Sequence, residues 1–125
     1  MRLLLDTHIL IWLMEDNPRL SVRARDELAG AREILVSSAS LWEIAIKVRV
    51  GKLNVDMERL IARMDLAGAV ELTVTHAHAL ATMRLPMLHR DPFDRLLVAQ
   101  AQAETMRLLT ADPRLTAYSE LVIAV

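Results

Sequence analysis

The stretch LLLDTHILIWLM, Leu3–Met14, decides the fold class of this chain. Three consecutive leucines have the length of a short buried strand, and the apolar run that begins at Ile9 has the length of a helix. Asp6, Thr7 and His8 stand between them, at the point where the strand would end. A strand that leads directly into a helix is the first unit of an α/β protein.

The rest of the chain repeats this alternation of strand and helix. Four further short apolar runs have the length of strands: Ile34–Val36, Val70–Val74, Leu108–Leu109 and Leu121–Val125. Amphipathic segments between them predict helices that follow Ser21, span about residues 39–50, follow Asp56, follow Thr75 and begin near Pro92. The three glycines fall where these helices would end. We therefore expect an α/β fold with a central, mainly parallel, five-stranded sheet.

Length and composition exclude several classes of protein. The chain has 125 residues, 54% of them hydrophobic, and is expected to form one domain, residues 1–125. The absence of cysteine excludes disulfides, thiolate zinc sites and a cysteine nucleophile. A net charge of −1 excludes a strongly cationic nucleic-acid coat. No apolar stretch is long and unbroken enough for a signal peptide or membrane span, so we expect a soluble, mature, cytoplasmic protein without a membrane partner.

Four acidic residues fall where the topology would gather side chains. Asp6 directly follows the first predicted strand, and Asp112 follows the fourth by two residues. Glu43 and Asp94 lie on helices next to the same edge. Because ligands bind at the carboxyl ends of parallel strands, these acids would share one crevice if the first and fourth strands are neighbours.

The aspartates also have a structural explanation as helix caps. Asp6 precedes a predicted helix, Asp112 precedes a proline, and Asp94 lies in a first helical turn, where the helix dipole favours an acid. Asp91, directly before Pro92, is explained entirely as the cap of its helix. We therefore leave Asp91 out of the candidate site.

Glu43 likewise has structural explanations, a capping box with Ser40 or an i, i+4 pair with Lys47. Glu43 and Asp94 nevertheless share their helix faces with apolar residues, and buried carboxylates are rare unless they are paired or bind a metal. Neighbouring carboxylates repel one another, and a divalent cation resolves that conflict. A set of carboxylates suits Mg²⁺ or Mn²⁺, which can promote hydrolysis of a phosphodiester.

Four segments together resemble the PIN-domain ribonucleases, and more closely the VapC-like toxins of VapBC type II toxin–antitoxin systems. They are LLLDTHILIWL (3–13), SSASLWEIAIKVRVGKL (37–53), HRDPFDRLLVAQA (89–101) and LLTADPRL (108–115). The resemblance implies a PIN-like α/β/α sandwich and a Mg²⁺-dependent endoribonuclease, with Mn²⁺ as a substitute. The catalytic and metal-binding residues that it implies are Asp6, Glu43, Asp94 and Asp112. It also implies a homodimer, a VapB-like antitoxin that blocks the active site, and a structured RNA substrate such as transfer RNA.

Basic residues close to these acids are candidates for contacts with RNA phosphates. They are Lys47, Arg49, Lys52 and Arg90. The first three follow Glu43 on the same predicted helix and its end, where cations are also favoured by the helix dipole alone. Phosphate binding and simple solvation of a helix end both explain the pattern.

Other polar and aromatic residues carry weaker expectations. Thr7 and Thr110 either orient a neighbouring carboxylate or serve in caps and turns. Trp12 and Trp42 are expected in the core or in a dimer contact, because they lie in apolar helical segments. The four histidines lack the spacing of a metal site, so we do not expect them to form one.

Two other functions stay open from the sequence. The same fold can act as a catalytically degenerate PIN-fold binding module, in which the four acids are only caps. It can also cleave DNA, since the acids do not distinguish the two sugars and no motif here reads the 2′-hydroxyl group.

Overall fold

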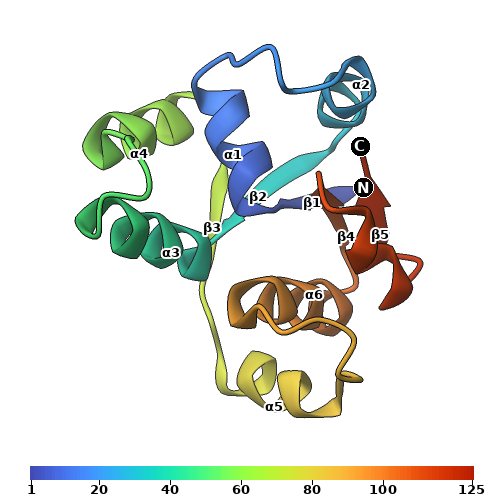
Figure 1. Cartoon of the computed structure of the whole chain (residues 1–125). Coiled ribbons are helices and arrows are strands. Elements are labelled where there is room, and N and C mark those ends of the chain that lie inside the picture. The colour runs from blue at the N-terminus through green and yellow to red at the C-terminus, as the bar shows by residue number, and fades with distance from the viewer.

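The computed structural model describes all 125 residues and contains one five-stranded sheet. The strands are β1 (Arg2–Leu5), β2 (Glu33–Ser37), β3 (Val70–Leu72), β4 (Arg107–Thr110) and β5 (Val122–Ala124). Their order is β3-β2-β1-β4-β5, and every neighbouring pair is parallel (Figure 1). The expected α/β fold with five strands is confirmed.

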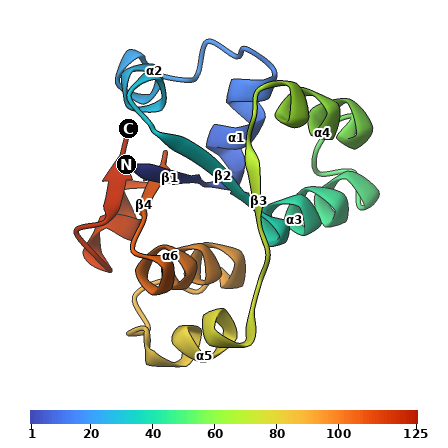
Figure 2. The ribbon, with the colours of Figure 1, turned by 180° about the vertical axis from the view of Figure 1, so that it is seen from behind.

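Helices cover both faces of this sheet. They are α1 (Thr7–Met14), α2 (Val22–Ala29), α3 (Ser38–Arg49), α4 (Met57–Leu66), α5 (His76–Arg84), α6 (Pro92–Glu104) and the short 3₁₀ helix η1 (Pro113–Ala117). Figures 1 and 2 show α1, α2 and α4 on one side of the sheet and α5 and α6 on the other. None of these helices combines the length and the apolar character that crossing a bilayer requires.

The side chains of β1 alternate between two hydrophobic cores. Leu3 and Leu5 belong to the core beneath α1, α2 and α4, whereas Leu4 belongs to the core beneath α6. All three are at most 2% exposed. A central parallel strand is buried on both faces, which explains why the strand consists of consecutive leucines rather than alternating polar and apolar residues.

Local capping signals set the ends of most helices. Asp91 caps α6 and Pro92 begins it, as the sequence predicted. Gly51 and Gly68 follow α3 and α4 with positive φ angles of 79° and 75°, a conformation that glycine adopts without steric cost. The predicted helix ends at these glycines are confirmed.

The pairing of β1 with β4 positions the candidate site. Leu5 lies opposite Leu109, so the two strands end side by side at one edge of the sheet. The Asp6 backbone N–H donates to the Leu109 carbonyl over 3.0 Å. The strand order reverses between these two strands, where ligands bind in α/β sheets.

Candidate active site

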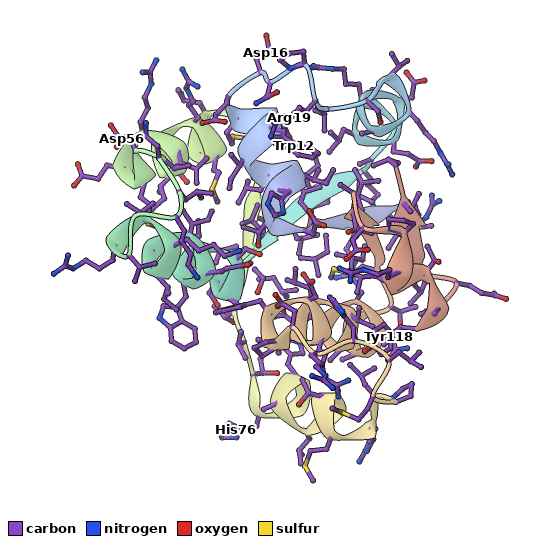
Figure 3. All side chains as sticks on the ribbon, viewed as in Figure 1. Trp12, Asp16, Arg19, Asp56, His76 and Tyr118 are labelled. Atoms are coloured by element: carbon purple, nitrogen blue, oxygen red, sulfur yellow. The ribbon has the colours of Figure 1, made fainter.

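A polar cleft of about 520 Å³ opens at the carboxyl ends of β1 and β4. It is lined by Asp6, Thr7, His8, Trp12, Arg19, Glu43, Lys47, His89, Asp91, Asp94, Ala111, Asp112, Pro113 and Arg114. All four predicted site acids are therefore in the same cleft. Trp12 and Arg19, which are labelled in Figure 3, lie on or next to α1.

Asp6 is both a helix cap and a residue of the cleft. Its Oδ1 accepts the Ile9 backbone N–H over 2.9 Å, which caps α1, and its Oδ2 accepts the hydroxyl of Thr110. The side chain is buried, and burial raises its pKa despite these hydrogen bonds. One carboxylate oxygen of Asp6 caps α1 and the other contacts Thr110. Asp6 can therefore cap the helix and line the cleft at the same time.

Glu43 is buried in α3 with both oxygens engaged. Thr7 donates its hydroxyl to Oε1 over 2.6 Å, and Lys47 donates to Oε2 over 2.8 Å. Glu43 in turn raises the pKa of Lys47. The capping box with Ser40 is wrong, because Ser37 caps α3 and the Ser40 hydroxyl has no partner. The charge of Glu43 is therefore compensated from within its own helix.

Asp94 lies in the first turn of α6 and faces the cleft. Its Oδ2 is 2.9 Å from His89 Nε2. Burial raises the pKa of Asp94 to about 6, and the negative charges of Asp91 and Asp6 act in the same direction. Asp91 itself accepts the backbone N–H groups of Phe93 and Asp94, so its predicted role as a cap is confirmed.

Asp112 caps η1 and is held by an arginine. Its Oδ1 accepts the Arg114 backbone N–H over 3.0 Å, and its Oδ2 accepts the Arg114 guanidinium over 2.8 Å. This contact holds the pKa of Asp112 below its usual value. The Asp112 backbone N–H donates to the Thr110 hydroxyl over 3.0 Å, which links Asp112 to Asp6 through one side chain.

The donor set of the cleft fits a divalent cation. Asp6 and Asp94 have no lysine or arginine partner, whereas Glu43 and Asp112 each have one. Burial raises the pKa of both Asp6 and Asp94, so the negative charge of each carboxylate is unfavourable without a cation nearby. Carboxylate oxygens are the ligands that hard divalent cations prefer, so the acids of this cleft are suited to bind one.

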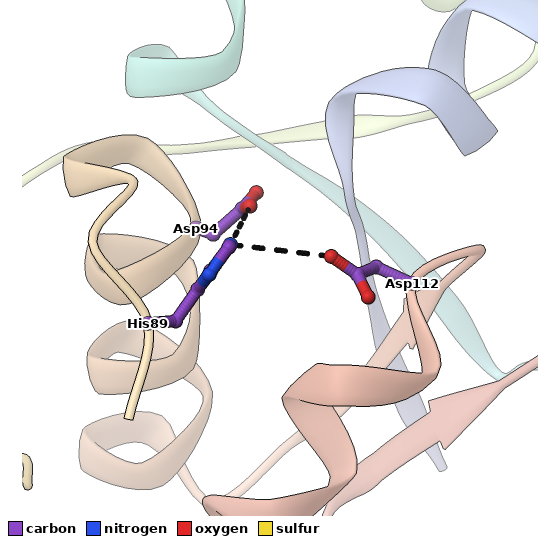
Figure 4. A group of neighbouring side chains, drawn as sticks. All are labelled: His89, Asp94 and Asp112. Atoms are coloured by element: carbon purple, nitrogen blue, oxygen red, sulfur yellow. Dashed lines mark hydrogen bonds and ion pairs between the residues drawn. The ribbon is translucent and has the colours of Figure 1, made fainter. Parts of the chain in front are cut away.

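The sequence did not predict a site role for His89. Its Nε2 lies between Asp94 and Asp112, 3.9 Å from Asp112 Oδ2 (Figure 4). One ligand atom from each of these three residues lies within 4.8 Å of the other two. The available signal was its place just before the cap of α6, in a segment that returns to the same edge of the sheet as Asp6.

The basic residues of the cleft differ from those expected. Lys47 lines it, whereas Arg49, Lys52 and Arg90 are exposed and lie outside its lining. Arg19 and Arg114 line the cleft instead. Contacts of these residues with RNA phosphates stay predictions.

The two tryptophans differ, because Trp12 packs half-buried against the core beneath α1, as expected, whereas Trp42 lies at the surface. Trp42 is 64% exposed and meets the edge of Phe93, with ring centroids 5.6 Å apart. Trp12 is half-buried at the cleft, with its ring centroid 5.9 Å from that of His8. A core role for Trp42 is therefore wrong, and a dimer contact stays a prediction.

Comparisons with known proteins agree with this architecture. A family model described as PIN domain matches residues 3–121. Ribonuclease VapC22 of Mycobacterium tuberculosis (strain ATCC 25618 / H37Rv) is 31% identical over 117 residues, covering 92% of this chain and 90% of that protein. The solved structure of VapBC2 from Rickettsia felis bound to a promoter DNA fragment matches with a TM-score of 0.72 and 20% identity, covering 100% and 98% of the two chains. A toxin–antitoxin complex from Klebsiella pneumoniae matches with a TM-score of 0.66 and 21% identity, covering 97% and 95%.

Proposed function

The chain belongs to the PIN-domain family, and on this premise we propose that it is a VapC-type endoribonuclease that uses Mg²⁺ to hydrolyse RNA phosphodiester bonds. One observation carries the proposal. Asp6 and Asp94 come from segments far apart in sequence, line one cleft and, unlike Glu43 and Asp112, have no lysine or arginine partner. The relative named as a ribonuclease supports the choice of reaction.

Each acid has a distinct role in this proposal. Asp6, Asp94 and Asp112 hold the ion, and Glu43 completes the pocket with its charge balanced by Lys47. When bound, Mg²⁺ supplies Lewis acidity that polarises the phosphodiester and makes water a better nucleophile; Mn²⁺ can substitute. Thr110 fixes the orientation of Asp6, and Thr7 fixes that of Glu43.

The substrate is held by the cations at the rim. Lys47, Arg19 and Arg114 line the cleft and can receive RNA phosphates, while Arg49, Lys52 and Arg90 can extend the contact beyond it. Water attacks phosphorus in line with the O3′–P bond. That bond breaks, the O3′ atom takes a proton, and the products carry a 5′-phosphate and a 3′-hydroxyl.

Partners follow from the relatives. The solved neighbours include toxin–antitoxin complexes, which supports a VapB-like antitoxin as the partner of this chain. The antitoxin blocks the cleft, and the chain becomes active when the antitoxin is removed. A homodimer in the cytoplasm is part of the same proposal. The substrate is a structured RNA such as transfer RNA.

The chemistry of the products tests this function. Hydrolysis by water needs no 2′-hydroxyl, so an RNA with one deoxyribose at the cleavage site is still cut and leaves a 5′-phosphate. A 2′,3′-cyclic phosphate product, or complete protection by that single deoxyribose, contradicts the mechanism. Folded protein that binds RNA and cleaves neither RNA nor DNA supports a binding module instead.

A further inference from the structure

His89 is placed in the cleft by an irregular segment whose backbone is anchored. It lies between α5 and α6, and its side chain is 15% exposed. Tyr118, labelled in Figure 3, donates its hydroxyl to the His89 carbonyl over 3.4 Å. The Arg95 guanidinium donates to the Pro86 carbonyl over 2.8 Å and to the Tyr118 hydroxyl over 3.2 Å. These bonds hold the segment, and with it the imidazole, against α6 and η1.

We propose that His89 is a direct ligand of the divalent cation, through Nε2, beside Asp94 and Asp112. This inference rests on the proposed function, because it adds a nitrogen ligand to the metal site of that function. Its basis is the position of Nε2, which is 2.9 Å from Asp94 Oδ2 and 3.9 Å from Asp112 Oδ2 (Figure 4).

The separations of these atoms match a coordination shell. In octahedral geometry with bonds of about 2.1 Å, adjacent ligand atoms lie about 3 Å apart and opposite ones about 4.2 Å apart. The two separations made by His89 Nε2 lie within about 0.3 Å of these two values, and the limit of 4.8 Å that encloses the whole set exceeds the opposite-ligand distance by about 0.6 Å. An ion can therefore enter between these side chains with only small movements of the three groups.

The imidazole can supply its lone pair from Nε2. In the metal-free protein, Nε2 and Asp94 Oδ2 form a hydrogen bond over 2.9 Å, in which Nε2 is the donor when the carboxylate is ionised. Nδ1 of His89 has no hydrogen-bond partner in the structure and can carry the single ring proton when Nε2 does not. Nε2 would then present its lone pair to a cation held beside Nε2 and Asp94, in place of the hydrogen bond between them.

The competing role for His89 is orientation of Asp94 alone. In that role Nε2 keeps its hydrogen and the imidazole stays outside the coordination shell. The two roles differ in one physical property, the bond between a nitrogen nucleus and the metal. They also differ in metal preference, because Mn²⁺ accepts an imidazole nitrogen more readily than the harder and more strongly hydrated Mg²⁺ does.

Pulsed electron paramagnetic resonance of bound Mn²⁺ tests the proposal directly. Mn²⁺-loaded wild-type protein, free of antitoxin, is compared with His89→Leu and with His8→Leu. His8 is the matched control, since it is the other histidine of the cleft. We expect the ¹⁴N coupling of a coordinated imidazole in the wild type and in His8→Leu, and its loss in His89→Leu. Coupling that is absent from the wild type, or that disappears with His8 instead, overturns the proposal.

Metal titrations provide a second readout that does not depend on catalysis. We expect His89→Leu to lose at least about tenfold in Mn²⁺ affinity and to lose a smaller factor in Mg²⁺ affinity. Equal losses for both ions contradict ligation by the imidazole. Asp94→Asn separates this inference from the proposed function. Mn²⁺ binding that requires Asp94 but shows no nitrogen coupling removes only the role of His89, whereas binding indifferent to Asp94 removes the metal site itself.

Discussion

Thr110, the last residue of β4, donates its hydroxyl to Oδ2 of Asp6, the residue that follows β1. The same hydroxyl oxygen accepts the Asp112 backbone N–H over 3.0 Å. One buried threonine thus joins the two central strands and two of the candidate metal ligands. The orientation of Asp6 and Asp112 therefore depends on the pairing of β1 with β4.

Replacing Thr110 with valine removes this link while keeping the shape of the side chain. We expect the affinity for Mn²⁺ to fall by about 10- to 100-fold, as for other groups that orient a metal ligand. Calorimetric titration measures it. Thr73→Val, at an exposed position, is the matched control. Unchanged affinity in Thr110→Val would show that the hydroxyl does not orient Asp6.

Lys47 balances the charge of Glu43, which is only 4% exposed. We expect Lys47→Met to destabilise the metal-free protein by about 1–3 kcal/mol, because it leaves a buried carboxylate without its charged donor. Adding Glu43→Gln should recover most of that loss, since the remaining group is neutral. Urea unfolding of both variants, with Lys52→Met as the exposed control, measures the effect. If the two substitutions lower the free energy of unfolding additively in the double variant, Lys47 and Glu43 do not act as a pair.

The pKa of Asp94 predicts how the stability of the metal-free protein depends on pH. Its folded-state pKa is about 6, above the ordinary value of 3.8, so the folded state holds a proton that the unfolded state has released. Stability therefore falls as the pH rises from about 4 to about 6, and the loss is complete above that range. The buried Asp6 acts in the same direction.

Asp94→Asn removes the part of this pH dependence that Asp94 contributes. In EDTA at pH 7.5 we expect the variant to melt a few degrees above the wild type, a shift of the size that about 1 kcal/mol produces. Saturating Mg²⁺ should raise the Tm of the wild type and leave that of the variant unchanged. Melting curves across pH test both points. If the Tm values of the two proteins change with pH in parallel, the pKa of Asp94 is not raised in the folded state.

Arg95 is predicted to hold the segment that carries His89. Its guanidinium donates to the carbonyls of Thr82, Leu85 and Pro86 over 3.1, 3.5 and 2.8 Å. We expect Arg95→Met to cost about 1–3 kcal/mol and to speed hydrogen exchange in residues 85–91, because three carbonyls, two of them partly buried, lose a charged donor. Arg84→Met, at an exposed position, is the control. Exchange that is no faster than in the control contradicts this role.

The elements of the fold were predictable because their signals are local. The leucines of β1, the cap and proline before α6, and the glycines after α3 and α4 each act within a few residues. The gathering of the four acids was predictable from the same signals, because strands β1 and β4 need only be neighbours. The true cap of α3 was missed because adjacent serines offer several start positions, and Ser37 rather than Ser40 takes it.

The position of His89 could not be predicted, for a physical reason. It lies outside any helix or strand, so no periodicity fixes the direction of its side chain. That direction depends on bonds between Arg95, Tyr118 and backbone carbonyls, which link positions 9 to 29 residues apart.

Cleavage of RNA by antitoxin-free protein tests the central claim most directly. Wild type, Asp6→Asn and Asp94→Asn are each incubated with a cellular RNA pool in Mg²⁺, and the wild type is also incubated in EDTA. The expected result is cleavage by the wild type in Mg²⁺ alone, with losses of at least about 100-fold in the variants and circular dichroism spectra that show all three proteins folded. Cleavage that persists in EDTA or in both variants would contradict the account, as would folded wild-type protein that cleaves no RNA in Mg²⁺.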